Sequence, residues 1–536
     1  MAATPRPIFA IFEGGGAKGV AHVGALDAIA NNNLDIVGVA GTSAGALVAV
    51  LVAIGLDAVD IMDEHDCDAN ILKRNGLDPI KLLGVREWGR FRTLHRLFEY
   101  LGQEESPGAF KCWNFLVSLP FAATTFASLI RRRGHFSNTP IKNFVNKVIR
   151  DRLDMINSEA GLDWDIPEEP TFGDLARGWP TVVPLKIVVT DVSSGELKIF
   201  DRRTAKVKVA EAVAASIAIP FIFEPARIPS FSDGFFADGG LVSNLPLWAY
   251  IEEKLIFERR GAPRVPVIGF SLQASRRKDG RNGQPKLLDY VGSLVETALA
   301  GSQGISRQFL DDLTVIPLST NLEMLDFGTS WAELKKAREA GRIDADRHIR
   351  FLLQVKPDRI RFELQAVHDE ALQMINARRK AQKLGRVDHL RVNLIRPWGN
   401  FSLRVVEGVN MNDDADDRLL LDRDGEGAAR VFRDKGVRVL RSNSAKDHES
   451  RRYMTKYERA LVRNSVQSII AVPIFRNGRE NWEREERDRD SPDGVLCLDS
   501  DEPDLTADFG NTELVKLLID KSSVLFAAIN LEPHNG

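Results

Sequence analysis

Two glycine-rich turns within the first 45 residues restrict the fold of this chain more than any other feature. The first, EGGGAKG, follows the apolar run 7–12, and the second, GTSAG, follows the apolar run 36–41. Apolar residues recur at helical spacing over 20–32, and 44–55 is predicted to be a second helix, rich in small residues. Strands that alternate with helices in this way favour a parallel sheet with helices on both faces. The sequence therefore predicts an α/β fold.

The second turn has the pattern of a nucleophile elbow. Gly41 and Gly45 flank Ser43 in a G-x-S-x-G motif that lies between a strand and a helix, which is the context this motif requires. The glycines permit a sharp turn that would leave the Ser43 hydroxyl exposed above a helix N-terminus. We interpret Ser43 as a nucleophile, with a purely structural turn as the alternative.

The first turn satisfies the dinucleotide fingerprint G-x-G-x-x-G through Gly14, Gly16 and Gly19. A nucleotide-binding fold needs an acidic residue about 20 positions later to bind a ribose, whereas the second strand here ends in the serine turn. The loop is therefore expected beside Ser43, at the carboxyl ends of adjacent parallel strands. Its backbone N–H groups, including that of Gly15, would face an oxyanion, and no cofactor is predicted.

A base for the serine is found in the segment FFADGGLVSNLPL. The histidines after residue 200 lie in helical, linker or late-domain contexts, and none fits a loop of the first sheet. Asp238 ends a short strand and is followed by Gly239 and Gly240. A carboxylate bonded directly to a serine can act as its general base in a dry environment. The sequence thus predicts that Ser43 and Asp238 act together.

Four motifs in this order, EGGGAKG, GTSAG, VAEAVAASIAIPFIFEP and ADGGLVSNLP, resemble the patatin-like phospholipase family over about 8–350. The resemblance implies a three-layer α/β/α fold with a mostly parallel sheet. It also implies hydrolysis of phospholipid or lysophospholipid acyl esters through an acyl-enzyme, without a metal. The substrate partner would be a phospholipid membrane surface.

The resemblance implies a role for each matching residue. Ser43 and Asp238 would form a dyad, and the oxyanion hole and supporting positions would be Gly14, Gly15, Gly16, Lys18, Gly41, Gly45, Gly239 and Gly240. Glu13 stands where Asp or Ser is common in the family, and Lys18 replaces Arg; neither departure touches the dyad. Ser216 and Pro220 are expected in the pocket wall. The alternatives are a general carboxylesterase or acyltransferase with the same dyad, and a ligand sensor with a silent lipase fold.

Beyond Leu384 the sequence changes to short strands, and this region resembles a GAF domain more loosely. The resemblance is carried by LRVNLIR, DRDGEGAARVF, SIIAVPIF and GVLCLDSDEP. It implies a small-molecule ligand such as a cyclic nucleotide, or dimerisation alone. We therefore expect the C-terminal region to regulate the hydrolase.

A charged helix is predicted from Asp358 to Lys383, before the GAF-like region. Its apolar residues follow a 4-3-4-3 spacing: Ile360, Leu364, Val367, Ala371 and Met374. That spacing suits a coiled-coil seam in a homodimer, and a single amphipathic surface helix fits it equally. We expect a hydrolase domain at 1–355, a connecting helix at 356–384 and a GAF-like domain at 385–536.

An aromatic insertion at 85–133 ends in three arginines. It is interpreted as a lid or interfacial element that meets anionic headgroups, or else as an ordinary helical subdomain. The stretch 110–130 is about long enough to span a bilayer. Lys111, Asn114 and Pro120 interrupt it, so a buried or interfacial element is expected instead.

Composition excludes other classes of protein. The net charge of −3 gives no basic field for a nucleic-acid polymer. The three cysteines are far apart, and no signal peptide is visible, so a cytoplasmic protein is predicted, peripheral at the inner membrane face. The run DEHDCD at 63–68 contains metal-ligand residue types, but a solvated helix face is the better interpretation and no metal is predicted.

Overall fold

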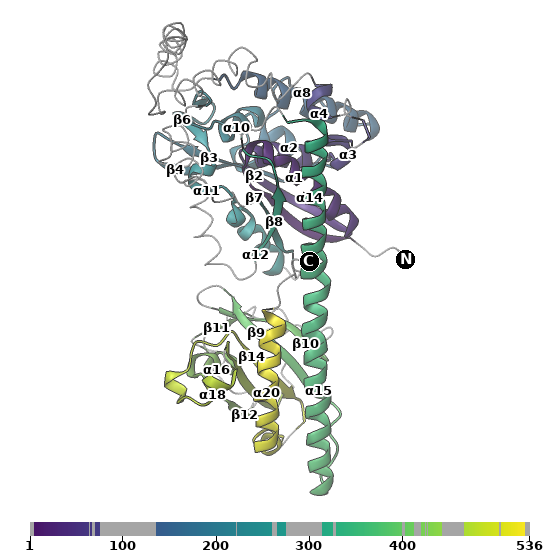
Figure 1. Cartoon of the computed structure of the whole chain (residues 1–536), viewed down its shortest axis with the longest axis vertical. Coiled ribbons are helices and arrows are strands. Elements are labelled where there is room, and N and C mark those ends of the chain that lie inside the picture. The colour runs from purple at the N-terminus through teal and green to yellow at the C-terminus, as the bar shows by residue number, and fades with distance from the viewer. Residues whose placement is uncertain are drawn as a thin grey trace, which may run out of the picture. The chain divides into compact units, whose positions relative to one another are not determined.

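The computed structural model describes residues 5–63, 65–66, 70–75, 136–220, 222–259, 265–274, 313–324, 329–398, 402–411, 420–423, 425, 427–441, 466–476, 478–502 and 505–530. The predicted insertion at 85–133, with its apolar stretch 110–130, lies outside these residues. Contacts divide the chain into two units (Figure 1): Met1–Gln308 with Leu313–Ile349, and Phe309–Asp312 with Arg350–Gly536.

The first unit is built on one twisted sheet with the order β5-β6-β3-β2-β1-β7-β8, and β4 pairs with β3. Its central strands β3, β2, β1, β7 and β8 run parallel, whereas β4, β5 and β6 pair antiparallel. The bounds are β1 Arg6–Phe12, β2 Leu34–Thr42, β3 Leu185–Asp191, β4 Glu196–Phe200, β5 Ala226–Ile228, β6 Ser232–Asp238, β7 Val267–Ala274 and β8 Leu313–Thr320. The predicted α/β fold with a mostly parallel sheet is confirmed.

Helices pack on both faces of this sheet. Successive side chains of a strand point to opposite faces, so β1 presents side chains to the helices on each side. Phe9 stacks on Tyr250 on one face, and Phe12 contacts His22 of α1 on the other. The described helices are η1 Gly16–Gly19, α1 Val20–Asn31, α2 Ala44–Ala53, α3 Ala58–Ile61, α4 Ile71–Arg74, α8 Thr139–Glu159, α9 Phe172–Leu175, η2 Arg202–Thr204, α10 Val209–Ser216, α11 Gly240–Ser243, η3 Leu247–Tyr250, α12 Ile251–Arg259 and α14 Trp331–Arg350.

The second unit is an antiparallel sheet with the order β11-β10-β9-β14-β13-β12 and helices packed on it. Its elements are η4 Phe351–Val355, α15 Lys356–Ala381, β9 Arg391–Trp398, β10 Ser402–Val409, β11 Leu420–Asp422, α16 Ala428–Asp434, β12 Arg438–Arg441, β13 Ser468–Ile474, α18 Gly478–Trp482, η6 Glu486–Asp488, β14 Gly494–Ser500, α19 Thr506–Phe509 and α20 Thr512–Ile529. This antiparallel α+β architecture agrees with the one expected for the C-terminal region.

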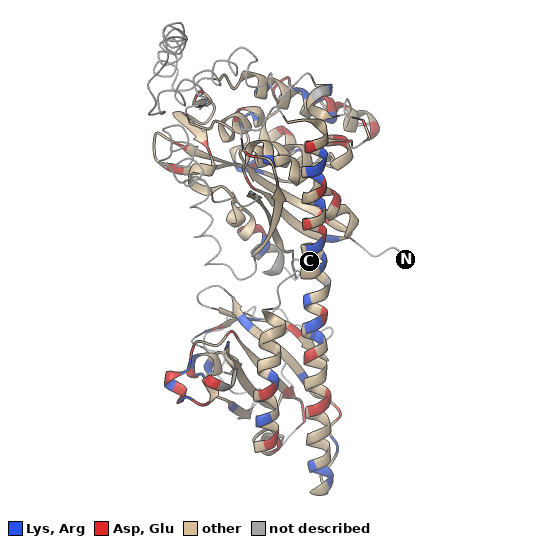
Figure 2. Ribbon diagram, viewed as in Figure 1, with Lys and Arg blue, Asp and Glu red and all other residues tan. Residues whose placement is uncertain are grey.

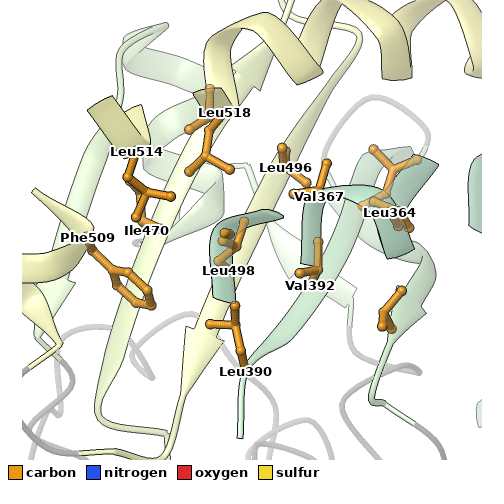
Figure 3. Close-up of a cluster of buried hydrophobic side chains, with 14 of the residues drawn as sticks. Leu364, Val367, Leu390, Val392, Ile470, Leu496, Leu498, Phe509, Leu514 and Leu518 are labelled. Carbon is orange, nitrogen blue, oxygen red and sulfur yellow. The ribbon is translucent and has the colours of Figure 1, made fainter. Parts of the chain in front are cut away.

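The apolar stripe of α15 is buried in the core of this second unit. Leu364 and Val367 point toward Val392 and Leu496 of the sheet (Figure 3), beside side chains from α20. Ala371 and Ile375 continue the buried stripe, while Lys, Arg, Asp and Glu are interspersed along the rest of the helix (Figure 2). Of the two interpretations of the 4-3-4-3 spacing, the structure shows an amphipathic helix packed on its own sheet.

The membrane and metal expectations can be compared with the described residues only. Among them, no helix combines the length and apolarity that crossing a bilayer needs. No group of three or more His, Cys, Asp or Glu side chains is arranged there to hold a metal ion. In the acidic run, the Asp63 carboxylate instead accepts a hydrogen bond from the His65 backbone N–H at 2.8 Å.

Candidate active site

Ser43 sits at the sharp turn between β2 and α2. Its φ of 53° and ψ of −125° place a non-glycine residue in a left-handed conformation, which costs about 1–3 kcal/mol. It is also the N-cap of α2, so the positive end of the helix dipole lies at its hydroxyl. Ser43 is only 6% exposed, in contrast to the expected exposed hydroxyl, because the segments around Gly14 and Ser216 pack against it.

Two glycines allow this turn to pack against its neighbours. A methyl group on Gly41 would lie 2.1 Å from the carbonyl oxygen of Gly45. A methyl group on Gly45 would lie 2.2 Å from the carbonyl oxygen of Phe12. The G-x-S-x-G spacing is thus explained by backbone contacts within the turn and between α2 and the end of β1.

Ser216 fixes the backbone of the serine turn. Its hydroxyl accepts a hydrogen bond from the Ser43 N–H at 2.9 Å and donates one to the Val188 carbonyl at 2.7 Å. Ser216 is fully buried at the end of α10. The sequence placed Ser216 in a pocket wall, but it did not indicate this bond to the turn.

Replacing Ser216 by Ala should lower the free energy of unfolding by about 1–3 kcal/mol, because two buried polar groups lose their partner. Hydrolysis should also slow, since the strained Ser43 backbone loses a support. Urea denaturation of the variant measures the first effect. An unchanged unfolding midpoint would contradict this role of Ser216.

Asp238 ends β6 and is 1% exposed. Burial raises the pKa of its carboxyl to about 7, although the Ser43 hydroxyl and the Gly240 N–H each lower it. Oδ1 accepts the Gly240 N–H at 2.8 Å, while Oδ2 is buried without a hydrogen-bond partner of normal length among the described residues. Asp238 therefore offers the Ser43 hydroxyl a desolvated carboxylate acceptor.

Sheet register brings the serine and the aspartate together although 195 positions separate them. Thr42, the residue before Ser43, pairs with Val188 of β3. Asp238 of β6 pairs with the next residue of β3, Val189. Since β3 lies between β2 and β6, Ser43 and Asp238 flank the same point of β3.

The glycine loop lies against this pair. A methyl group on Gly14 would be 2.8 Å from the Cβ of Ser43, so the loop touches the serine, as predicted from the sequence. The Gly14 N–H, however, donates to the Asn244 carbonyl at 3.2 Å. The Gly14 N–H is therefore already bonded, whereas the N–H groups of Gly15 and Gly16 make no such bond to the described residues and stay the predicted oxyanion donors.

Two side chains and one backbone N–H that the sequence analysis did not place in the site hold Glu13, the residue before the loop. The carbonyl of Glu13 is 2.9 Å from the Nε2 of His22, and its buried carboxylate accepts bonds from the Asn244 amide at 2.8 Å and the Leu272 N–H at 2.5 Å. Burial lowers the pKa of His22 to about 4, so the ring is neutral and Nε2 carries the donated proton. The Asn in the motif ADGGLVSNLP is the sequence feature that could have indicated the contact between Asn244 and Glu13.

The remaining predicted residues lie around these contacts. Lys18 is half-buried in η1, and its backbone N–H donates to the Gly15 carbonyl at 3.2 Å. A methyl group on Gly239 would lie 2.3 Å from the Val188 carbonyl oxygen, which shows that the chain crosses closely over β3 after Asp238. The predicted site residues thus lie in three segments that meet at the carboxyl ends of β1, β2 and β3.

The site thus combines a mostly parallel α/β sheet, a serine turn after β2 and a buried aspartate beside that turn. Comparison with known families identifies residues 10–251 as a patatin-like phospholipase domain. The predicted family is thereby confirmed for these residues.

Related proteins extend the comparison. An uncharacterized Bacillus subtilis protein, YqhO, is 24% identical over 298 residues, which cover 54% of this chain and 78% of YqhO. The structure of VipD from Legionella pneumophila is similar with a TM-score of 0.33 and 18% identity, over 72% of this chain and 78% of VipD. The GAF domain of a sensor histidine kinase from Bacillus halodurans matches with a TM-score of 0.19 and 14% identity, over 30% of this chain and 92% of that domain.

Proposed function

We propose that this protein is a serine lipid acyl hydrolase that cleaves acyl esters of phospholipids or lysophospholipids. The observation that carries the proposal is the strained Ser43 turn beside a buried Asp238 whose pKa is raised to about 7. A base with a pKa near neutral pH is suited to accept a proton from a serine hydroxyl. Membership of residues 10–251 in the patatin-like phospholipase family supports a lipid ester as substrate.

The proposed mechanism has two halves. The Ser43 oxygen attacks the ester carbonyl while Asp238 takes the hydroxyl proton, and the N–H groups of Gly15 and Gly16 bind the oxyanion. Collapse of the intermediate breaks the bond to the alcohol, which receives the proton from Asp238 and leaves an acyl-enzyme. Water then attacks the acyl-enzyme in the same way, releases the fatty acid and restores Ser43.

We propose further that the C-terminal unit regulates the hydrolase through a small-molecule ligand, for which a cyclic nucleotide is the first candidate. Support comes from the GAF-like motifs of 385–536 and from the division of the chain into two units. The hydrolase domain would act at a phospholipid membrane surface. Its bounds of 1–355, and those of the connecting helix at 356–384, belong to the same proposal.

The first experiment measures fatty-acid release from mixed phospholipid vesicles by the full-length chain, with and without a panel of cyclic nucleotides. Wild type should release fatty acid, and the Ser43→Ala variant should release at least about 10⁴-fold less. Release that depends on a nucleotide would support regulation by the C-terminal unit. Equal release by wild type and the Ser43→Ala variant would overturn the proposed nucleophile.

A further inference from the structure

We infer that Asn244 is a positioning residue that sets the orientation of the Gly14–Gly15 peptide, and thereby the oxyanion donor of Gly15. The inference rests on the proposed function and adds to it a residue that neither touches the substrate nor belongs to the dyad. Asn244 directly follows α11, six positions after Asp238, and is 6% exposed. Asn244 therefore lies on the same segment as the proposed base, Asp238, and contacts the glycine loop that carries the proposed oxyanion donors.

Both N–H groups of the Asn244 amide have an acceptor on the glycine loop. Nδ2 donates to Oε1 of Glu13 at 2.8 Å and to the Gly14 carbonyl at 3.2 Å. The backbone carbonyl of Asn244 accepts the Gly14 N–H at 3.2 Å. One residue thus holds Gly14 by two bonds and Glu13, the residue before the loop, by a third, and a side-chain amide can supply two donors in this way.

The bond to the Gly14 carbonyl has a consequence for the next N–H group. In a trans peptide the carbonyl oxygen and the following N–H point in opposite directions, and the described residues contain no cis peptide. Because the Gly14 carbonyl points at the Asn244 amide, the Gly15 N–H points away from it. That N–H is therefore held in one direction before a substrate arrives.

The glycine loop needs this support because its own residues resist rotation weakly. Gly14, Gly15 and Gly16 carry no side chains that could anchor them, and Gly16 has a φ of 57°, a conformation that glycine adopts freely. A flip of the Gly14–Gly15 peptide would turn the Gly15 N–H in the opposite direction. A donor that is oriented in advance stabilises an oxyanion without reorganisation during the reaction.

The segment of Asn244 is itself fixed to the serine turn and to the base. The Thr42 hydroxyl donates to the Ser243 carbonyl at 3.2 Å, and the Thr190 hydroxyl donates to the Asp238 carbonyl at 3.0 Å. Asn244 therefore connects the oxyanion loop to a rigid support that also carries the dyad. Loss of its amide should change the rate of the chemical step and leave the base unchanged.

The test compares full-length wild type with Asn244→Ala and Asn244→Asp, using 4-nitrophenyl butyrate as a soluble ester. Asn244→Asp keeps the size of the side chain and removes both donors, so it serves if Asn244→Ala folds poorly. We expect kcat to fall about 100-fold in each variant, with KM within threefold of wild type. The acid limb of the pH profile, which reports Asp238, should keep its midpoint.

Asn157→Ala is the matched control. Asn157 also bonds to backbone groups through its amide, with Nδ2 at 3.1 Å from the Trp164 carbonyl, but it lies at the end of α8, outside the site. Its kcat should equal that of wild type. A kcat within twofold of wild type in the Asn244 variants, while Ser43→Ala is inactive, would overturn the role of Asn244 and leave the proposed function intact.

If wild type shows no turnover that depends on Ser43, kinetics cannot test the role of Asn244. Crystal structures of the Asn244 variants test that role separately from the proposed hydrolase function. That kinetic result would overturn the proposed function. The structural result then decides the orientation independently: a rotated or disordered Gly14–Gly15 peptide in the variants supports control by Asn244. An unchanged peptide would contradict it.

Discussion

Replacing Asp238 by Asn is expected to abolish ester hydrolysis and, at the same time, to stabilise the folded protein above neutral pH. An amide cannot accept the Ser43 proton as a base, so kcat should fall by at least about 1000-fold. In wild type, kcat/KM should rise with pH through a midpoint near 7, because only the ionised Asp238 is a base and burial raises its pKa to about 7. The Asn variant should lack this limb.

The stability change follows from the same pKa. As pH rises from about 4 to 7, the unfolded chain loses the Asp238 proton while the folded chain keeps it, so folding becomes less favourable. Above pH 7 the folded protein carries a buried charge, at a cost on the order of 4 kcal/mol for a shift from 3.8 to about 7. A neutral amide avoids that charge.

Thermal unfolding at pH 8 and at pH 4 measures this difference. The Asp238→Asn variant should unfold at a higher temperature than wild type at pH 8. Most of this gain should be lost near pH 4, where the folded wild type keeps the Asp238 proton and the unfolded chain, with a pKa of 3.8, is only partly ionised. A variant that is less stable than wild type at pH 8 would contradict the buried, desolvated carboxyl. Active-site residues often lower the stability of the folded protein while they provide activity.

Replacing Gly14 by Ala should cause the second large loss. The added methyl group would lie 2.5 Å from Oδ1 of Asn244 and 2.8 Å from the Cβ of Ser43, so the loop or the serine turn must move. Either movement would change the position of Ser43 relative to the proposed oxyanion donors, the N–H groups of Gly15 and Gly16. We expect kcat for a soluble ester to fall about 100- to 1000-fold, which is the typical effect of losing an oxyanion donor.

Gly385→Ala is the matched control for this substitution. A methyl group there would meet no atom within 4 Å, and its φ is not left-handed. Its kcat should be unchanged and its free energy of unfolding should change by less than about 0.5 kcal/mol. If Gly14→Ala is as active as Gly385→Ala, the glycine loop does not contact the reacting ester.

The sequence alone determined the fold class and the residues of the candidate pair. Apolar periodicity and glycine turns are local signals, and they placed β1, α1, β2 and α2 close to where the structure has them. Ser43 could be selected because its motif lies between a strand and a helix. Asp238 could be selected because it ends a strand, is followed by two glycines, and competes with no suitably placed histidine.

Only the tertiary structure decided how these residues interact. The bonds from Ser216 to Ser43 and from Asn244 to Glu13 join residues 173 and 231 positions apart, and no local pattern encodes such pairs. They exist because sheet order places β6 and β1 near the same end of β2 and β3. For the same reason burial, not residue type, raises the pKa of Asp238. The Gly14 N–H is bonded to the Asn244 carbonyl, while the N–H groups of Gly15 and Gly16 make no such bond to the described residues.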